Sequence, residues 1–305
     1  MVSERNFLIL ENIVFLNYLI KVTNQRRNEV MENTTTTNRV VVYLQSQENL
    51  NVLPSCFDTL TAINVSSFHF GFNQDSSAYI HLNDHDPNDS VFDSLWSYMK
   101  QAQQKNVKVI AMLGGAGGAY TKLFEKYETF YPLFVKMLKN YQFDGVDLDV
   151  EEAVTIESIK KLINDLRRDF PTNFLITSAP VCSSLQNGID HFAGINWADV
   201  KNEIDWFNVQ FYSGFGSLSS VNDYNKIINA GYDSNQILSG LLTNPKDGVG
   251  YVDINIVCKT LETLRATYGS EFGGAMGWEF YNANNIQERV DPEGWVNSMK
   301  LAVQG

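Results

Sequence analysis

Eight short segments rich in β-branched and aromatic residues recur along the chain, and stretches with helical periodicity separate most of them. Strands that alternate with helices favour parallel βαβ units. Eight such units after residue 38 match the size of a (β/α)8 TIM barrel without a large insertion domain. The strands that this interpretation requires are 39–45, 63–72, 107–115, 145–151, 174–181, 206–212, 236–243 and 273–280.

A doubly wound open sheet is the alternative fold. It normally carries a glycine-rich phosphate-binding turn after its first strand, and the segment "YLQSQENL" over 43–50 has no such turn. Helical periodicity is clearest over 156–170, where apolar side chains three and four residues apart form one stripe. Further helices are expected over 90–105, 130–141, 220–230, 253–269 and 294–303.

The polar tract "MENTTTTN" over 31–38 divides the chain into two parts. We expect residues 1–38 to be a disordered or weakly structured extension and residues 39–305 to be a single domain. Glu11 and Asn12 interrupt the apolar N-terminal stretch, which makes it a poor membrane span and a poor signal peptide. We therefore expect no membrane association, and a cytoplasmic rather than a secreted protein.

The net charge of −12 argues against nucleic acid as a partner, because phosphate binding requires clustered Lys and Arg. Cys56, Cys182 and Cys258 are too widely spaced for a metal-ligand pair or a disulfide framework. We expect them to be isolated thiols in or near the core. The protein is expected to be a monomer that uses no cofactor.

The segment "FDGVDLDVEE" over 143–152 places acidic side chains in an otherwise strand-like run. Strand side chains alternate between faces, so Asp147, Asp149 and Glu151 share one face. In a barrel this row would line the interior and climb toward the C-terminal end, where barrel enzymes place their chemistry. Close carboxylates cannot all ionise in a dry interior. We expect Asp147 to share a proton with Asp149, and a protonated Glu151 at the mouth to act as general acid.

The run from Asp144 to Glu151 resembles the D-G-x-D-x-D-x-E signature of glycoside hydrolase family 18, and the resemblance extends over nearly the whole chain from residue 39. It implies a catalytic domain over 39–305 in which the nucleophile is the substrate's own 2-acetamido carbonyl. By this resemblance Glu151 would protonate the leaving oxygen and later activate water. Asp149 would orient the acetamide and stabilise the oxazolinium ion, and Asp147 belongs to the same catalytic row.

The resemblance also assigns residues at the ends of other strands. Tyr212 would donate its hydroxyl to the acetamido carbonyl, and Gln210, on the same face, could add a second contact. Trp278 would form the floor under the sugar at the cleavage point. Independently of the resemblance, we interpret Gly114 and Gly115 as positions where backbone comes close to bound sugar. Ordinary core packing is the alternative for the two aromatic residues, and a plain bulge is the alternative for the glycines.

Two patterns resemble metal sites but lack their requirements. The acidic run over 143–152 could be a solvated loop or a calcium site, but it lacks the Gly and the distant Glu of an EF-hand loop. The segment "HLNDHDPND" over 81–89 carries His81 and His85, but Pro87 and the Asn and Asp content indicate a surface or sugar-contacting loop. We therefore expect no metal.

Departures from the common chitinase pattern point to a substrate class. Met112 stands where many family chitinases have Ser, and the segment "QFYS" over 210–213 replaces M-x-Y-D. These features resemble the fungal endo-β-N-acetylglucosaminidases of the family, which cut the GlcNAc–GlcNAc core of N-glycans. The segment 244–272 is too short for the α+β insertion of processive chitinases. The alternatives are a chitinase acting on chitin oligomers and a chitinase-like lectin, although a lectin would lack the acid.

Overall fold

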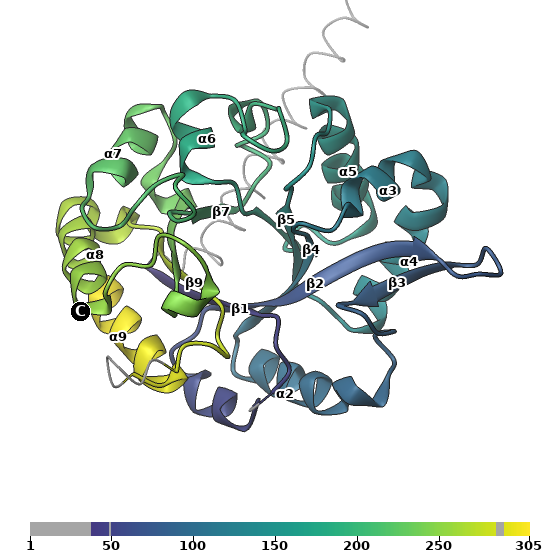
Figure 1. The fold of residues 1–305 in the computed structure, drawn as a ribbon, viewed down its shortest axis with the longest axis horizontal. Coiled ribbons are helices and arrows are strands. Elements are labelled where there is room, and N and C mark those ends of the chain that lie inside the picture. The colour runs from purple at the N-terminus through teal and green to yellow at the C-terminus, as the bar shows by residue number, and fades with distance from the viewer. Residues whose placement is uncertain (1–37, 49, 285–289) are drawn as a thin grey trace, which may run out of the picture. The chain divides into compact units, whose positions relative to one another are not determined.

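The computed structural model describes residues 38–48, 50–284 and 290–305. The extension expected over 1–38 therefore falls almost entirely outside the described residues. Eight parallel strands close into a barrel, and helices surround it (Figure 1). Neighbouring strands follow the order β1-β9-β8-β7-β6-β5-β4-β2, and a β1–β2 pairing closes the ring. The predicted (β/α)8 barrel is confirmed.

The predicted strands and long helices are all present, with ends shifted by a few residues. The barrel strands are β1 Arg39–Leu44, β2 Ala62–Phe72, β4 Lys108–Gly114, β5 Gly145–Asp149, β6 Leu175–Ser178, β7 Trp206–Gln210, β8 Ile237–Leu242 and β9 Gly274–Trp278. The α-helices are α2 Asp93–Gln104, α3 Ala119–Glu125, α4 Tyr127–Asn140, α5 Ile156–Asp169, α6 Cys182–Asn187, α7 Asn222–Asn229, α8 Ile254–Tyr268 and α9 Pro292–Gln304. The short helices α3 and α6 were not expected from the periodicity, because each offers too few residues to define it.

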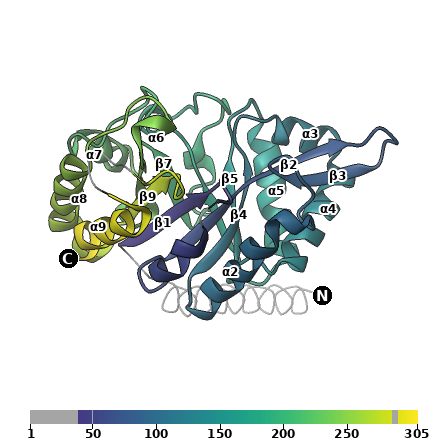
Figure 2. The ribbon, with the colours of Figure 1, turned by 60° about the horizontal axis from the view of Figure 1, so that its bottom comes forward.

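A further strand, β3 Ala78–Leu82, lies outside the barrel and pairs antiparallel with the outer half of β2. The expectation of a loop over 81–89 is therefore wrong for His81 and Leu82. Ile80 and Leu82 bury their side chains while Tyr79 and His81 alternate with them, which is the pattern of a half-buried strand. Figure 2 shows the β2–β3 hairpin projecting from the barrel beside α3 and α4.

Helix α5, which follows the acidic strand, shows why the helices form where they do. The Thr155 side chain accepts a hydrogen bond from the Ser158 backbone N–H at 3.2 Å and caps the first turn. One stripe of apolar side chains faces the barrel, as the sequence period predicts. The helix ends at Asp169, two residues before Pro171, because the residue that precedes a proline disfavours the helical conformation.

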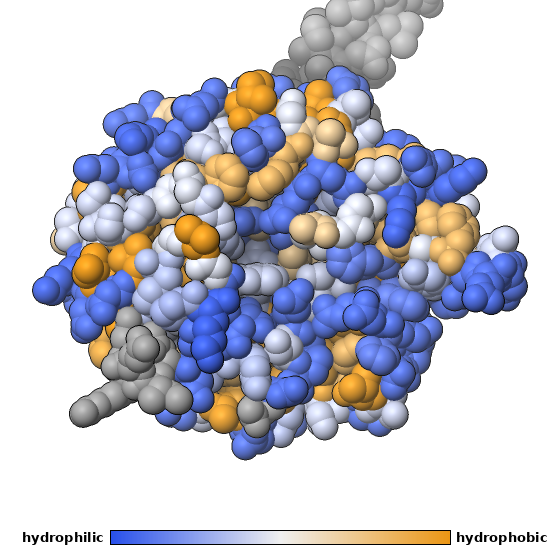
Figure 3. All heavy atoms as spheres, in the orientation of Figure 1, coloured by the Kyte–Doolittle hydropathy of each residue, from blue (hydrophilic) through white to orange (hydrophobic). Residues whose placement is uncertain are grey.

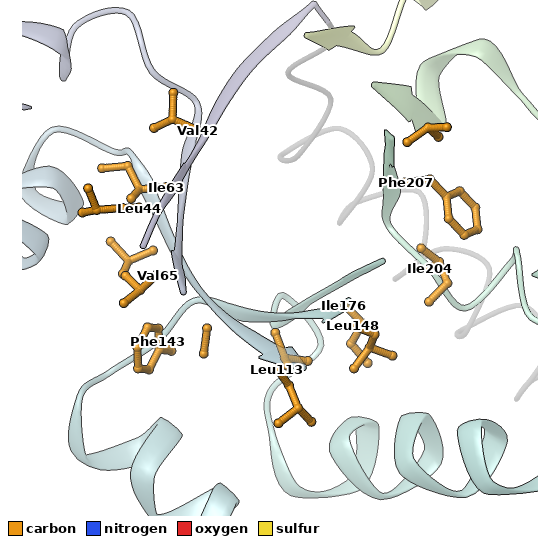
Figure 4. Close-up of a cluster of buried hydrophobic side chains, with 14 of the residues drawn as sticks. Val42, Leu44, Ile63, Val65, Leu113, Phe143, Leu148, Ile176, Ile204 and Phe207 are labelled. Carbon is orange, nitrogen blue, oxygen red and sulfur yellow. The ribbon is translucent and has the colours of Figure 1, made fainter. Parts of the chain in front are cut away.

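The core has two layers because strand side chains alternate between the two sides of the barrel wall. Outward-facing residues pack against the helices, and Figure 4 shows part of this layer, including Val42, Ile63, Leu148 and Phe207. Inward-facing residues form a smaller cluster inside the barrel. That cluster comprises Val41, Tyr43, Ala62, Ile110, Met112, Leu175, Ala179, Trp206, Leu238 and Met276. These apolar side chains, together with buried polar ones such as Thr177 and Asn208, surround the acidic row on β5.

Candidate active site

The acidic row begins inside the barrel and ends at its mouth. Asp147 is fully buried on β5, Asp149 is 5% exposed at the last position of the strand, and Glu151 lies two residues further and is half-buried. The strand is thus shorter than the predicted 145–151. Figure 3 shows a hollow at the centre of the face seen in Figure 1, with hydrophilic residues around it.

Three side chains from three strands hold the Asp147 carboxylate. It accepts hydrogen bonds from the Tyr43 hydroxyl at 2.6 Å, the Thr177 hydroxyl at 2.5 Å and the Asn208 amide at 3.0 Å. Burial raises the pKa of Asp147, and these donors oppose that rise by stabilising its ionised form. Asp147 makes no hydrogen bond to Asp149 in the described part of the chain, so the expected sharing of a proton between them is not seen.

The side-chain amide of Gln210, at the end of β7, instead links the other two carboxylates. Its Nε2 lies 3.2 Å from Asp149 Oδ1 and 3.4 Å from Glu151 Oε1, and it donates to the Ala179 carbonyl at 2.8 Å. Asp149 and Glu151 are therefore the two carboxylates that share one amide donor. This geometry places the Gln210 side-chain amide between the carboxylates of Asp149 and Glu151.

Burial and repulsion between carboxylates shift the titration of this pair in one direction. The pKa of Asp149 is raised well above its ordinary value by burial and by the negative charges of Glu151, Asp147 and Asp190. The pKa of Glu151 is raised by burial, which the hydrogen bond from Gln210 opposes, and also by the charge of Asp190. Raised pKa values favour retention of a proton on the pair near neutral pH, which is what a general acid needs.

Gly114, the last residue of β4, and Gly115, which follows it, contact the end of β5. Gly114 has a φ of +106°, and a Cβ atom there would lie 2.2 Å from the Asp149 carbonyl oxygen. The Gly115 N–H donates to the same carbonyl at 2.9 Å. The close approach that requires glycine at position 114 is therefore to the β5 backbone. A contact of these two glycines with sugar stays a prediction.

A second link joins the same two loops. The carboxylate of Glu152 accepts hydrogen bonds from the backbone N–H groups of Tyr120, at 2.7 Å, and Thr121, at 3.0 Å, and another from the Thr121 hydroxyl. These N–H groups lie in the first turn of α3 and have no partner within the helix. Glu152, the residue after Glu151, thus links the loop after β5 to helix α3, which follows the neighbouring strand β4.

Two aromatic residues complete the mouth. Tyr212 lies two residues beyond β7 and is largely buried, and burial together with the charges of Asp149 and Glu151 raises its pKa. Trp278, the last residue of β9, is half-buried, and its ring centroid lies 5.5 Å from that of Tyr43. The buried carboxylate next to it, Glu279, accepts hydrogen bonds from the backbone N–H groups of Gln45 and Ser46 and fixes the loop after β1.

The family model described as "Glycosyl hydrolases family 18" matches residues 39–244, which is more than half of the chain. The chain belongs to glycosyl hydrolase family 18. A solved structure of a fungal endo-β-N-acetylglucosaminidase of family 18 is 33% identical, with a TM-score of 0.78 over 87% of this chain and 98% of that chain. The structure of the chitinase ChiC from Aspergillus fumigatus is 32% identical, with a TM-score of 0.75 over 88% of this chain and 100% of that chain.

Curated family members give a second comparison. Endochitinase 3 of Metarhizium robertsii is 28% identical over 226 residues, 65% of this chain and 68% of that protein. Chitinase 2 of Rhizopus oligosporus is 29% identical over 207 residues, 61% of this chain and 36% of that protein, so the chain spans about a third of its length.

The family-18 site contains groups that the sequence motifs did not indicate. Tyr43, Thr177 and Asn208 bind Asp147, and Glu152 anchors the loop that carries Glu151. A signal was available for the first three, because each is a polar side chain at an inward-facing position of a predicted strand. Glu152 gave no such signal, since its partners are backbone groups of a helix that the periodicity did not predict.

Other expectations concern groups outside the site. In the described ranges, no cluster of three or more His, Cys, Asp or Glu side chains is arranged to hold a metal ion. His81 stacks on Tyr79, whereas His85 lies 3.5 Å from Asp89. The three cysteines are free thiols in or near the core, as predicted. No described helix is long and apolar enough to cross a membrane.

Proposed function

We propose that the protein is a retaining glycosidase that cleaves the β-1,4 bond between GlcNAc residues by substrate-assisted catalysis. The observation that carries this proposal is the Gln210 amide, whose Nε2 lies within hydrogen-bond reach of both Asp149 and Glu151 at the barrel mouth. In this arrangement Glu151 can hold the proton while Asp149 accepts a hydrogen bond. No second carboxylate needs to attack the sugar, because the acetamide of the substrate supplies the nucleophile.

In the first step the Glu151 carboxyl transfers its proton to the glycosidic oxygen as the C1–O bond breaks. The acetamido carbonyl oxygen attacks C1 from the opposite face and forms an oxazolinium ion. Asp149 accepts a hydrogen bond from the acetamide N–H, and its negative charge stabilises the cation. Tyr212 donates its hydroxyl to the acetamido oxygen. Holding the acetamide beside C1 makes the attack intramolecular, which can lower the barrier by about 7–11 kcal/mol.

In the second step Glu151, now ionised, takes a proton from a water molecule that attacks C1. The oxazolinium ring opens and the acetamide is restored. Two inversions at C1 leave the β-configuration in the product. Asp147 takes no part in proton transfer, because its three donors hold it as an acceptor beneath Asp149.

For the substrate, we infer that the enzyme is an endo-β-N-acetylglucosaminidase acting on the chitobiose core of N-glycans. Residues 243–273, all of them described, contain α8 and two 3-10 helices but no strand, so the α+β insertion of processive chitinases has no place there. A cleft without that wall admits a branched glycan. A chitinase is the second candidate, because the curated relatives are named chitinases and ChiC is similar to the same extent.

The test is to incubate the enzyme with a high-mannose glycoprotein and with chitohexaose and to follow both by mass spectrometry. We expect release of the glycan with one GlcNAc left on the protein, and slow or no cleavage of chitohexaose. Glu151→Gln should reduce both rates about 100- to 10,000-fold, since Gln has no proton to give. Cleavage of chitohexaose alone would identify a chitinase, and cleavage of neither would reject the proposed activity.

A further inference from the structure

The β2–β3 hairpin has two faces of different character. Phe70 points to α4, where its ring centroid lies 5.1 Å from that of Phe130. On the opposite face stand His69 and Gly71 of β2, and paired beside them are His81 and Tyr79 of β3. Directly opposite residues of an antiparallel pair share a face, so these four residues form one surface.

This surface is continuous with the mouth of the barrel. Ser67, two residues before His69 on β2, is buried in the barrel, and its hydroxyl lies 3.5 Å from the Met112 sulfur on the next strand. Further out, the His69 ring lies against Gly117 of the loop after β4, where a Cβ atom would approach the ring to 2.4 Å. The surface therefore leads from the catalytic hollow past the glycine loop and out along the hairpin.

Beyond His69 the surface consists of two stacked rings. The ring centroids of Tyr79 and His81 are 3.9 Å apart and their planes differ by 20°. The Tyr79 ring lies across Gly71, since a Cβ atom on Gly71 would be 2.2 Å from its hydroxyl oxygen. Glycine at position 71 thus gives the tyrosine room to lie over the sheet. Both rings are half-buried, which leaves part of each available to a ligand.

We propose that Tyr79 and His81 form a binding site for sugar rings of the substrate that lie beyond the cleaved GlcNAc pair. Aromatic rings present a flat apolar face to the C–H groups of a pyranose, and the tyrosine hydroxyl and the imidazole add hydrogen bonds to its hydroxyl groups. Continuity with the catalytic hollow fixes the occupant as a distal part of the same neutral oligosaccharide. This proposal rests on the proposed function for the identity of the ligand.

The experiment measures binding without turnover. In the Glu151→Gln background, calorimetry gives the Kd of chitohexaose, a high-mannose glycopeptide and chitobiose. We expect Tyr79→Ala to weaken binding of at least one of the two long ligands about three- to tenfold. The loss for chitobiose should be smaller, because a disaccharide at the cleavage point does not reach the hairpin. Tyr79→Phe should keep most of the affinity, since it retains the ring.

Phe72→Ala is the matched control. Phe72 is an aromatic residue of the same hairpin, is 48% exposed and lies on the opposite face, so its removal should leave each Kd unchanged. Thermal melting establishes that each variant is folded. Unchanged Kd values for both long ligands in Tyr79→Ala, or equal losses in Phe72→Ala, would overturn the inference. Failure of the proposed function is seen separately, as absence of cleavage by the wild-type enzyme.

Discussion

Asp149 is a residue whose place in the site costs folding free energy. Its carboxyl group is buried next to Glu151, Asp147 and Asp190, so its pKa in the folded protein lies well above the ordinary value. A carboxyl group with a raised folded pKa stabilises the fold most at pH values below its unfolded pKa. That contribution is lost as the pH rises from the ordinary Asp pKa through the raised folded pKa.

We therefore predict that Asp149→Asn raises stability at neutral pH by about 0.5–2 kcal/mol while it strongly lowers hydrolysis. The Asn oxygen can still accept from Gln210, but the side chain carries no charge. Denaturant melts of both proteins between pH 3 and pH 8 check this. The difference should be small at the acid end and grow with pH. A variant that is less stable than wild type at pH 8 would show that the ionised Asp149 is favourably placed.

For single residues, the sequence predicts which acids face the barrel interior but not which side chains hold them. The period of two along β5 places Asp147 and Asp149 on one face without any tertiary information. The partners of Asp147 come from β1, β6 and β7, and their distances depend on how the barrel closes. Glu151 lies outside the strand, so its link to Gln210 depends on a loop that no period describes.

Among the elements, helix α3 and the loop after β5 are joined by the Glu152 carboxylate. This makes Glu152 a positioning residue for the adjacent Glu151. We predict that Glu152→Gln lowers the free energy of unfolding by about 1–3 kcal/mol, because a single amide oxygen replaces two acceptor oxygens. It should also lower kcat about tenfold or more while KM changes little, since a small displacement of the acid affects the chemical step more than binding.

Glu157→Gln is the control for that variant. Glu157 is an exposed glutamate in the first turn of α5, five residues after Glu152, and it makes none of the site contacts described above. Steady-state kinetics and urea melts of both variants give the comparison. Equal effects of the two substitutions, or a loss of stability in Glu152→Gln with kcat unchanged, would contradict a positioning role.

Elements with a long apolar period were predictable, and elements defined by a partner were not. Helix α5 has its stripe and its Thr155 cap in the local sequence. Strand β3 has only five residues, and it is stable because β2 extends beyond the barrel wall to pair with it. Helix α3 has seven residues, and its first turn depends on Glu152 from another loop. Helix α3 thus depends on a contact that is distant in sequence, whereas β3 depends on how far its hairpin partner β2 continues beyond the barrel wall.

For the molecule as a whole, the closed barrel brings the residues that we propose to act in catalysis to one end. Glu151 follows β5, Gln210 ends β7 and Trp278 ends β9, and parallel strands place all three ends on the same face. This convergence followed from the predicted fold, because the eight strands and their direction were sufficient to give it. The substrate depends on loop shapes at that face, for which the sequence offers only resemblances.

The most direct test of the account is the configuration of the first-formed product. Proton NMR of the wild-type enzyme acting on the substrate that it cleaves can show the anomeric signal before mutarotation. Attack by the acetamide followed by attack by water predicts the β-anomer, because C1 is inverted twice. An initial α-anomer would contradict the substrate-assisted mechanism, since it would require a single direct attack by water with Glu151 as acid and another group as base.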